Sequence, residues 1–312
     1  MYTPINLHQL EIFLSVAERK SFSKAAALLH TSQPSVSMQI RNLEQALGIN
    51  LFDRLGRAIY LTCEGELVLE YAKRIFGGIA SLQSDLENLK GIKGGRIEVG
   101  ASRVPSSTTV PLAFALFKKK YPQTNIVVKT ALSRQIEQWV LDDEIDLAIV
   151  AGEPISRLLV TEPYYEEELI AVIPNRHPLA KRAAVLAEEL VKETFLLPYT
   201  GRVTEFMEKA FASRGLAFKE QIILGSREAV KAALSVGYGI SIMPKSAMDL
   251  DGKSSFLVTK KIHGLDLKFP VNIIYHKDKH LSRLALAFLK FLRELPTHRI
   301  PRSRGHKRAT PR

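Results

Sequence analysis

Cysteine is almost absent from this chain of 312 residues, which contains only Cys63. A single cysteine excludes an internal disulfide and any metal site built on paired cysteines, and the eight histidines are dispersed. We therefore expect no metal and no bound cofactor. Because Cys63 follows Thr62 at the expected start of a helix, a redox role for its thiol stays open beside the simpler interpretation of an inert small residue.

Long apolar segments are also missing. No run approaches the roughly 20 apolar residues that a membrane helix needs, and no basic stretch precedes an apolar one at the N-terminus. We therefore expect a protein that neither spans a membrane nor is exported, and that works in the cytoplasm. With 46% hydrophobic residues, the chain has enough apolar content for the cores of two or three ordinary domains.

Catalytic sequence motifs are missing as well. The chain has no HExxH, no GxSxG and no Walker-type phosphate loop. Residues 237–239, Gly-Tyr-Gly, resemble the start of a dinucleotide fingerprint, but they are expected between a helix and a following strand, the reverse of the required order. The acidic run at 166–168 is better explained as a solvated strand edge than as a metal site. These absences indicate a protein that is not an enzyme.

Basic residues outnumber acidic ones by 44 to 32, which gives a net charge of +12 and favours a polyanionic partner. The excess is local. Residues 19–57 carry six basic and two acidic side chains, and residues 296–312 carry six basic and no acidic ones. We interpret 19–57 as a nucleic-acid footprint. The Pro- and Arg-rich segment 296–312 is expected to be a disordered basic tail, either a plain solvated appendage or a source of nonspecific attraction to phosphates.

Residues 21–47 have the pattern of two short helices joined by a tight turn. The apolar residues of the second helix recur at spacings of four, three and four, which predicts one buried stripe. This stripe consists of Val36, Ile40, Leu43 and Leu47. Ser32 is a natural N-cap, and Gly48 ends the helix. Any globular protein can contain an amphipathic helix, but three consecutive alanines in the first helix and a very short turn are typical of a helix-turn-helix, here about residues 22–41.

The polar side of the second helix is free to enter a DNA groove. The residues that we expect to contact DNA from this motif are Ser23, Ser32, Gln33, Pro34, Ser35, Ser37, Met38 and Arg41. Residues 51–62 then have the pattern of strand, turn and strand, which is typical of a wing. Arg54 and Arg57 are expected at the base and the tip of this wing, placed for phosphates or a narrow minor groove.

The stretch from residue 7 to residue 65 resembles the DNA-binding domain of LysR-type transcriptional regulators. That family typically opens with a helix like LHQLEIFLSVAE, continues with SF(S/T)xAAxxLxxSQPxxSxxIxxLE and closes with LFxRxxRxxxLTxxG, and nearly every position is filled here. One position departs from the pattern. The residue after Ser37 is often an arginine that contacts a base edge, and here it is Met38. Because methionine donates no hydrogen bond, base selection there must use apolar contact, for instance with a thymine methyl group.

Thr62 is the expected N-cap of a long helix that runs to about residue 90. Its apolar residues recur at alternating spacings of four and three, which is a heptad seam with charged flanks. The seam consists of Val68, Ala72, Ile75, Ile79, Leu82, Leu86 and Leu89. So narrow a stripe indicates a partner helix from a second copy of the chain, and the resemblance likewise implies a dimerising linker helix. The glycine pair 77–78 lowers helix stability and predicts a bend or a hinge.

A glycine-rich break at residues 90–95 marks a domain boundary, beyond which short strands alternate with helices. This alternation predicts α/β layers with mainly parallel sheets. Connections near residues 161–163 and 265–268 indicate two lobes joined by two crossing strands. This pattern, with short phrases such as RIEVGAS, IDLAIV and GYGISIMP, resembles the effector domain of the same regulators, which is similar to periplasmic binding proteins.

In such a fold a small ligand is expected between the lobes, where strands end and helix N-termini offer free N–H groups. Applying that rule gives the candidate effector-binding residues Ser102, Arg103, Ser133, Gly152, Thr200, Arg202 and Ser226, in loops that the resemblance also implicates. The two arginines favour a carboxylate, sulfate or phosphate group on the ligand. Each hydroxyl alone is explained at least as well as a helix N-cap, so the prediction rests on the cluster.

The predicted fold is therefore an α+β multidomain protein: an N-terminal winged helix-turn-helix, a long linker helix and a C-terminal two-lobed α/β effector domain similar to periplasmic binding proteins. We assign residues 5–62 to DNA binding, 63–90 to dimerisation and 96–295 to effector binding. Within the last segment, lobe I comprises about 96–162 with 268–295, and lobe II comprises about 163–267. Residues 296–312 form the tail.

The function predicted from these features is sequence-specific binding to double-stranded promoter DNA, modulated by a small anionic effector. The resemblance implies a homodimer or a homotetramer formed as a dimer of dimers, and RNA polymerase is a further partner to consider. An exported solute-binding protein would explain the second part of the chain, but it predicts an export signal and leaves the first 62 residues unexplained. A nucleoid-type architectural protein would explain the first part, but it needs no two-lobed pocket and lacks the roughly thousandfold promoter preference of specific binders.

Overall fold

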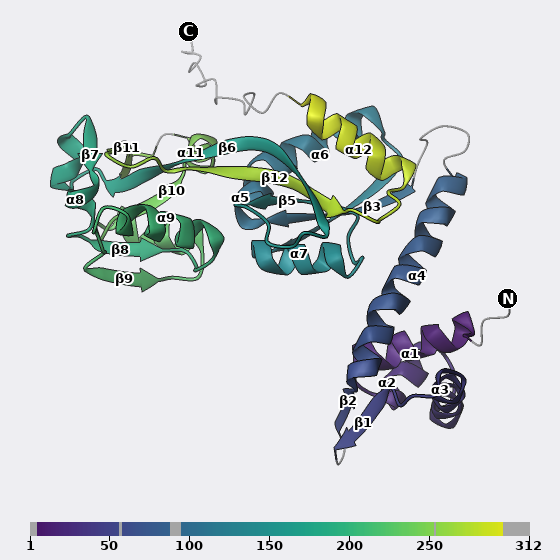
Figure 1. The fold of residues 1–312 in the computed structure, drawn as a ribbon. Helices are drawn as coiled ribbons and strands as arrows, with labels where there is room; N and C mark the ends of the chain where they lie inside the picture. The colour runs from purple at the N-terminus through teal and green to yellow at the C-terminus, as the bar shows by residue number, and fades with distance from the viewer. Residues whose placement is uncertain (1–4, 56–57, 88–94, 253, 296–312) are drawn as a thin grey trace, which may run out of the picture. The chain divides into compact units, whose positions relative to one another are not determined.

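The computed structural model describes residues 5–55, 58–87, 95–252 and 254–295 (Figure 1). Within them the chain forms two compact units. The first contains the residues up to 83 together with 142–144, and the second contains residues 84–141 and those from 145 onward. The expected basic tail and residues 90–94 of the glycine-rich break expected at 90–95 lie outside the described residues.

Three helices and a two-stranded hairpin make up the first unit, and a long helix follows them. The elements are α1 (Leu7–Arg19), α2 (Phe22–Leu28), α3 (Gln33–Leu47), β1 (Phe52–Leu55), β2 (Ala58–Leu61) and α4 (Cys63–Glu87). The first three helices pack on one another around a core that includes the fully buried Phe13, Val36 and Leu43. This arrangement is a winged helix-turn-helix, as the spacing of the apolar residues predicted.

Single residues determine where these helices begin and end. Ser32 Oγ accepts a hydrogen bond from the backbone N–H three residues on, at 3.3 Å, and Gly48 ends α3 with a φ of 71°, where glycine has no steric penalty. Thr62 Oγ1 accepts a hydrogen bond from Gly65 N at 2.9 Å at the start of α4. Gly65 leaves no room for a side chain, since a Cβ there would lie 2.2 Å from Leu51 O.

The second unit is built on a mixed sheet with two long strands at its centre. Its strands are β3 (Gly95–Ser102), β4 (Thr124–Ala131), β5 (Leu147–Ala151), β6 (Leu159–Pro174), β7 (Ala184–Leu186), β10 (Ser241–Pro244), β11 (Leu257–His263) and β12 (Lys268–His276). They are hydrogen-bonded in the order β4-β3-β5-β12-β6-β11-β7, and β10 also pairs with β6. The short strands β8 (Thr194–Leu197) and β9 (Glu220–Ile223) form a separate parallel pair.

The long strands β6 and β12 run between two lobes (Figure 1). Lobe I contains β3 to β5 with the helices α5 (Arg103–Ser107), α6 (Thr109–Lys120), α7 (Ser133–Leu141) and α12 (Arg283–Glu294). Lobe II contains β7 to β11 with the 3-10 helix η2 (Pro178–Lys181) and the helices α8 (Ala187–Leu190), α9 (Arg202–Ala212), α10 (Arg227–Ser235) and α11 (Lys245–Asp251).

The prediction of mainly parallel sheets is wrong for the centre of this unit. Strand β12 runs antiparallel to both β5 and β6, and β10 and β11 run antiparallel to β6. Parallel pairing is confined to the β-α-β parts of each lobe, such as β3 with β4 and β5. The chain passes between the lobes on two adjacent extended strands, and such a pair needs no crossover helix.

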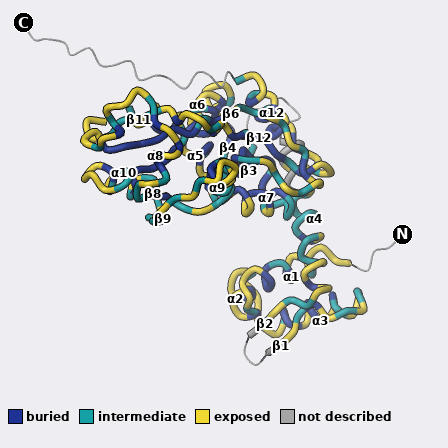
Figure 2. The backbone as a smooth tube through the Cα atoms, turned by 60° about the vertical axis from the view of Figure 1, so that its left-hand side comes forward, coloured by how far each residue is buried: buried dark blue, intermediate teal, exposed yellow. Residues whose placement is uncertain are grey.

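Apolar side chains on both faces of the sheet are covered by helices. Strand β5 is buried along its whole length, and it contacts both α5 and α7. Helices α6 and α12 pack together through Phe117 and Phe288, whose ring centroids lie 4.9 Å apart. In Figure 2 the buried residues follow the strands, and the exposed ones lie on the outer sides of the helices.

The acidic run at 166–168 does not form the predicted solvated strand edge. It lies on β6, an interior strand, and Glu167 is only 3% exposed. The Glu167 carboxylate accepts hydrogen bonds from Ser246 N at 3.1 Å and from Ser246 Oγ at 2.5 Å. Burial raises the pKa of Glu167, although these two hydrogen bonds oppose that shift.

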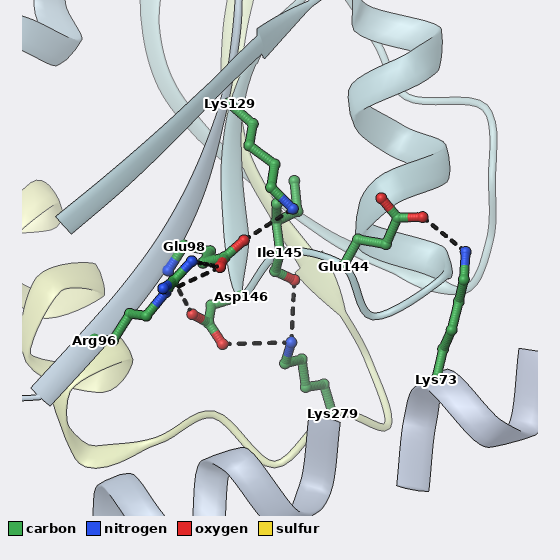
Figure 3. Close-up of polar contacts among 8 residues, drawn as sticks. All are labelled: Lys73, Arg96, Glu98, Lys129, Glu144, Ile145, Asp146 and Lys279. Atoms are coloured by element: carbon green, nitrogen blue, oxygen red, sulfur yellow. Dashed lines mark hydrogen bonds and ion pairs between the residues drawn. The ribbon is translucent and has the colours of Figure 1, made fainter. Parts of the chain in front are cut away.

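A polar network ties the strands of lobe I together at one end (Figure 3). The Glu98 carboxylate accepts hydrogen bonds from the Arg96 guanidinium and forms an ion pair with Lys129 Nζ at 2.9 Å. Glu98 N donates to Asp146 Oδ2 at 2.8 Å, and Lys279 Nζ lies 3.4 Å from Asp146 Oδ1. The network therefore joins β3, β4, the approach to β5 and the segment after β12.

Candidate functional site

The first candidate surface is the outer side of α3 in the first unit. Helices α1 and α2 cover the apolar stripe of α3 and leave its other side in solvent. Gln33, Pro34 and Arg41 are exposed there, and the Met38 side chain is 61% exposed. Ser23 is also exposed, at the start of α2. An exposed helix side of this kind can enter a major groove.

Ser37 differs from its expected place on that exposed side. It is only 8% exposed, and its Oγ accepts a hydrogen bond from Gln33 Nε2 at 3.4 Å. Ser35 is half-buried, and its backbone N–H is bound by the capping hydroxyl of Ser32. The expectation that Ser37 lies on the exposed side with Arg41 is therefore wrong. Ser37 is next to the fully buried Val36, at the edge of the apolar stripe that the neighbouring helices cover.

The hairpin β1–β2 has the geometry predicted for the wing. The two strands pair antiparallel from Phe52 with Leu61 to Leu55 with Ala58. Arg54 lies within β1, paired with Ile59, and its side chain is outside the described part of the chain. The same holds for the whole of Arg57, which belongs to the connection at 56–57.

The predicted seam on α4 divides into two parts. Ala72 is fully buried in the core of the first unit, and Val68 packs against that core. Ile79 is half-buried, whereas Ile75, Leu82 and Leu86 are exposed, and Leu89 lies outside the described residues. Two further exposed apolar residues, Leu67 and Tyr71, precede Ile75 at four-residue spacing. The start of the seam therefore serves the chain's own core, and the exposed apolar row is Leu67, Tyr71, Ile75, Leu82 and Leu86.

The second candidate site is a cavity of about 190 Å³ between the lobes of the second unit, called here the main cavity. Lobe I contributes residues from α5 and the end of β4, and lobe II contributes residues from the ends of β8 and β10 and from α9 to α11. Its apolar lining includes Leu169, Leu197, Met207, Ile242 and Met243. Its polar lining includes Arg103, Ser106, Ser107, Thr130, Tyr199, Thr204, Ser226, Arg227 and Glu228.

Arg103 and Tyr199 meet across the cleft. The Arg103 guanidinium carbon lies 4.6 Å from the centre of the Tyr199 ring, a cation–π distance. Burial raises the pKa of Tyr199, although the positive charges of Arg103 and Arg227 oppose that shift. The phenol therefore stays neutral near pH 7 and offers a hydrogen-bond donor between two cations.

Arg227 provides the second cation of the main cavity. Its side chain is 21% exposed, and its charged partners are distant: Nε lies 3.6 Å from Glu228 Oε1 and Nη2 lies 3.7 Å from Asp251 Oδ1. Among the described residues, its buried Nη1 has no hydrogen-bond partner. A buried donor without an acceptor is costly, and an anionic ligand would remove that cost.

The seven predicted effector residues fall into three groups. Arg103 and Ser226 line the main cavity, where Ser226 also caps α10 by accepting from Ala229 N at 3.1 Å. Ser102, Ser133 and Arg202 line a minor cavity of about 20 Å³, enough for about one water molecule, together with Arg103 and Tyr199. Gly152 and Thr200 are in the lining of neither of these cavities.

Hydrogen bonds inside the protein engage several of these groups. Ser102 Oγ accepts from Ala151 N at 2.9 Å, and Ser133 Oγ donates to Ala151 O at 3.0 Å. Arg202 Nη1 forms an ion pair with the Glu137 carboxylate. The geometry thus favours structural roles for the two hydroxyls, and it pairs Arg227 with carboxylates less closely than Arg202.

Tyr199 and Arg227 are two of the main-cavity residues that the sequence rule missed. Tyr199 follows the end of β8 by two positions, and Arg227 is the first residue of α10, directly after its cap. The rule selected hydroxyls and arginines in the loops themselves. Extending it by one residue into the following helix would have included Arg227.

Comparison with known proteins identifies both parts of the chain. Residues 7–66 match the bacterial regulatory helix-turn-helix protein family, lysR type, and residues 90–296 match the LysR substrate binding domain. This chain belongs to the LysR family. It is a LysR-type DNA-binding transcriptional regulator with an effector-binding domain. Its relatives are transcriptional regulators, a class that is distinct from enzymes.

The relatives cover nearly the whole LysR-type chain. It is 33% identical to the HTH-type transcriptional activator CmpR of Synechocystis over 92% of this chain and 94% of that one, and 31% identical to a probable RuBisCO transcriptional regulator of Cyanophora paradoxa over 91% and 90%. The structure of full-length CbnR complexed with its target DNA has a TM-score of 0.68 at 22% identity, covering 93% and 99%. The regulatory domain of Synechocystis CcmR, in complex with 2-PG, has a TM-score of 0.60 at 25% identity, covering 66% and 99%.

Two absences and the position of the cysteine complete the description of this LysR-type protein. Across the described parts of the chain, no group of three or more histidine, cysteine, aspartate or glutamate side chains is placed to hold a metal ion. No helix in those same parts has both the length and the apolar character needed to cross a membrane. Cys63 is exposed at the first position of α4.

Proposed function

We propose that this regulator binds a specific promoter as a homodimer, and that a small anionic effector in the main cavity changes how it binds. The observation that carries the effector part is the buried Arg227 Nη1, which finds no hydrogen-bond acceptor in the described residues and lines the same cavity as Arg103. Two guanidinium groups and a neutral phenol suit a carboxylate or a phosphate group.

The size of the main cavity supports a small metabolite. At about 190 Å³ it is below the roughly 300–1,000 Å³ of drug-sized pockets. The apolar lining of the cavity suits a ligand with a short carbon skeleton. The 2-PG bound to the CcmR regulatory domain makes that compound the first candidate effector.

For the DNA-binding part, we propose that residues 5–62 dock with α3 in the major groove. Gln33, Pro34, Met38 and Arg41 are exposed on that helix and are the candidates for base and backbone contact. Ser23 and Ser32 lie at helix starts, where N–H groups favour phosphates. Arg54 and Arg57 keep their proposed role in the wing.

For the assembly, we propose that α4 pairs with α4 of a second copy through its exposed apolar row. Unpaired, these side chains would leave apolar surface in water over several turns. A dimer of dimers and contact with RNA polymerase extend this proposal. We assign residues 63–90 to dimerisation and 96–295 to effector binding, with lobe I at about 96–162 and 268–295 and lobe II at about 163–267.

Regulation requires that the effector bind two arrangements of the protein with different affinities. The main cavity is made by both lobes, so a ligand that bridges them favours one lobe separation over others. In a dimer on DNA, a change in the effector domains passes through α4 to the DNA-binding domains. The spacing of the half-sites and the bend of the DNA then change with effector.

The effector proposal is tested by titrating 2-PG into the full chain by calorimetry. Arg227→Met and Arg103→Met should each weaken binding about 10- to 100-fold, because a hydrogen bond to a charged group contributes about 1.5–3 kcal/mol. The matched control is Arg182→Met, since Arg182 is exposed, pairs with Glu189 and lines neither cavity. Equal affinity in all three variants would contradict an anion site at the arginines.

The regulatory proposal is tested by footprinting on the promoter beside the protein's own gene, with and without 2-PG and a panel of other small anionic metabolites. A footprint that shortens or lengthens with one compound identifies the effector and links it to DNA geometry. A footprint that no anion changes would contradict modulation through the main cavity.

A further inference from the structure

Two ion pairs join the lobes beside the minor cavity, between α7 of lobe I and α9 of lobe II. The inner pair is Arg202 with Glu137, and the outer pair is Arg134 with Glu205. In each helix the two partners are three residues apart, so they lie on one face, one turn from each other. The arginines come from opposite lobes, which makes the two pairs reciprocal.

The inner pair is buried and held on both sides. The Arg202 side chain is 11% exposed and that of Glu137 is 7% exposed. The second carboxylate oxygen of Glu137 accepts from Ile155 N at 3.3 Å, within lobe I. The Arg202 stem lies over Gly152, where an added Cβ would be 2.3 Å from Arg202 Cδ. Gly152 therefore permits the arginine of lobe II to enter lobe I.

The outer pair lies in solvent and repeats the contact. Arg134 Nη2 donates to both Glu205 carboxylate oxygens at 3.1 Å. The Arg134 side chain is 67% exposed and that of Glu205 is 45% exposed, so water and salt screen the outer pair more strongly than the inner pair. The inner pair thus supplies most of the attraction, and the outer pair adds orientation.

We propose that these four residues form a clasp that sets the separation of the lobes and thereby pre-forms the main cavity. The clasp and the Arg103–Tyr199 contact lie along the same cleft, since Arg103 and Tyr199 line both cavities and Arg202 lines the minor one. Breaking the clasp leaves β6 and β12 as the backbone connection between the lobes, and extended strands permit rotation. Glu137 is therefore a positioning residue, and its regulatory meaning rests on the proposed effector site.

Lobe separation is measured by spin labels on α7 and α9 of the full chain. Cys63→Ser removes the chain's single cysteine, and Gln135→Cys with Glu208→Cys places labels on exposed positions of the two helices. Labelled protein is mixed with an excess of unlabelled protein, so that distances within one chain dominate the pulsed electron resonance signal. Glu137→Gln in this background should lengthen the mean distance by about 2 Å or more, the scale of a domain rearrangement.

Three further variants and a control distinguish a change in lobe separation from a general loss of folding. Glu137→Gln with Arg202→Met removes both inner charges, so it should recover the melting temperature that the single change lowers while keeping the longer distance. Arg134→Glu alone should lengthen the distance, and Arg134→Glu with Glu205→Arg should restore it, because the outer pair is exposed and tolerates exchange. Glu294→Gln is the control, since it breaks an exposed pair with Lys290 inside lobe I.

The clasp would be overturned if Glu137→Gln kept the wild-type distance. It would also be overturned if Arg134→Glu with Glu205→Arg failed to restore the distance that Arg134→Glu alone had lengthened. Binding of 2-PG is measured on the same samples. Where 2-PG binds the wild type, Glu137→Gln should weaken it about tenfold, because fewer molecules hold the competent arrangement, and saturating 2-PG should return the distance to the wild-type value. Equal affinity with an altered distance would overturn the link to the cavity. Absence of 2-PG binding to the wild type contradicts the candidate effector alone, since the distances without ligand still decide the clasp.

Discussion

Met38 is the residue at which this chain departs from the arginine frequent in its family, and it is exposed in the middle of the proposed DNA-binding surface. Met38→Ala should reduce discrimination at one base pair by about 1 kcal/mol, because an apolar contact with a thymine methyl is lost. Selection from a randomised promoter library measures this change. Gln45→Ala, also exposed on α3 but near its end, is the control. A uniform loss of affinity over all sequences would assign Met38 to backbone contact.

Two carboxylates of lobe I should contribute to a loss of stability at acid pH. Burial raises the pKa of Glu98, but hydrogen bonds and charges from Lys129 and Arg96 outweigh it and leave that pKa below the usual 4.5. The Arg293 guanidinium likewise lowers the pKa of Glu162, against burial. A pKa that is lower in the folded state stabilises the fold above about pH 4.5, and the contribution is lost as the pH falls below that value.

The measurement is the free energy of unfolding by urea between pH 7 and pH 3. Glu98→Gln and Glu162→Gln should each flatten the acid side of that profile. Glu153→Gln is a suitable control, since no ion pair or hydrogen bond of its carboxylate is among those described. An unchanged acid slope in the first two variants would mean that these pairs contribute nothing net.

At the scale of elements, two of the three glycines of α4, Gly65 and Gly78, have opposite surroundings. Gly65→Ala should lower stability by about 1–3 kcal/mol, since its Cβ would collide with Leu51 O and force the start of the helix away from the hairpin. Gly78→Ala meets nothing within 4 Å and should raise stability by about 0.8–1 kcal/mol through helix propensity. Chemical denaturation compares them. If both substitutions changed the free energy of unfolding equally and in the same direction, the close approach of Gly65 to Leu51 O would be contradicted.

The exposed apolar row of α4 provides the second prediction at this scale. Leu82→Glu should weaken dimerisation by about 30-fold or more, because a charge buried in a helix pair costs roughly 2 kcal/mol or more. Sedimentation equilibrium gives the dissociation constant. Gln83→Glu, exposed on the adjacent position, adds the same charge off the row. A dimer that tolerates both substitutions would place the interface elsewhere.

For the whole molecule, two DNA-binding domains linked by α4 should require a fixed phase along the duplex. Inserting about five base pairs between half-sites turns one of them to the opposite side of the DNA and should lower affinity sharply, whereas about ten base pairs restores the facing. Gel-shift titration on the two altered promoters tests this. Insensitivity to phase would indicate domains that bind independently.

Local sequence patterns predicted the helices and their caps well, and they predicted less well which side chains other elements cover. The caps Ser32 and Thr62 and the helix-turn-helix follow from spacing and capping chemistry within a few residues. Glu167 was misplaced because an acidic triplet gives no indication that β12 and α11 enclose it. Ser37 was misplaced because its burial depends on how neighbouring helices pack on α3.

The candidate site shows the same division between local and distant information. Arg103 was found because it directly follows β3, and Ser226 because it lies in the loop between β9 and α10. Arg202 was assigned to the ligand, but Glu137, 65 residues away in the chain, neutralises it. Only the fold brings these two residues together, so no spacing rule predicts which arginine remains free.

The antiparallel ladder of β6 and β12 contains one irregularity, at the point where Val271 faces Tyr165 and Asn272 faces Pro163. Tyr164 is the extra residue of this bulge, and bulges increase the local twist of a strand pair. The two lobes of the second unit are thus joined by a strand pair whose ladder is interrupted at a single tyrosine. Deuterium uptake by the backbone amides should be slow in the β6–β12 ladder on both sides of the bulge, whatever angle the lobes adopt. Any change in uptake on ligand binding should be concentrated at Tyr164.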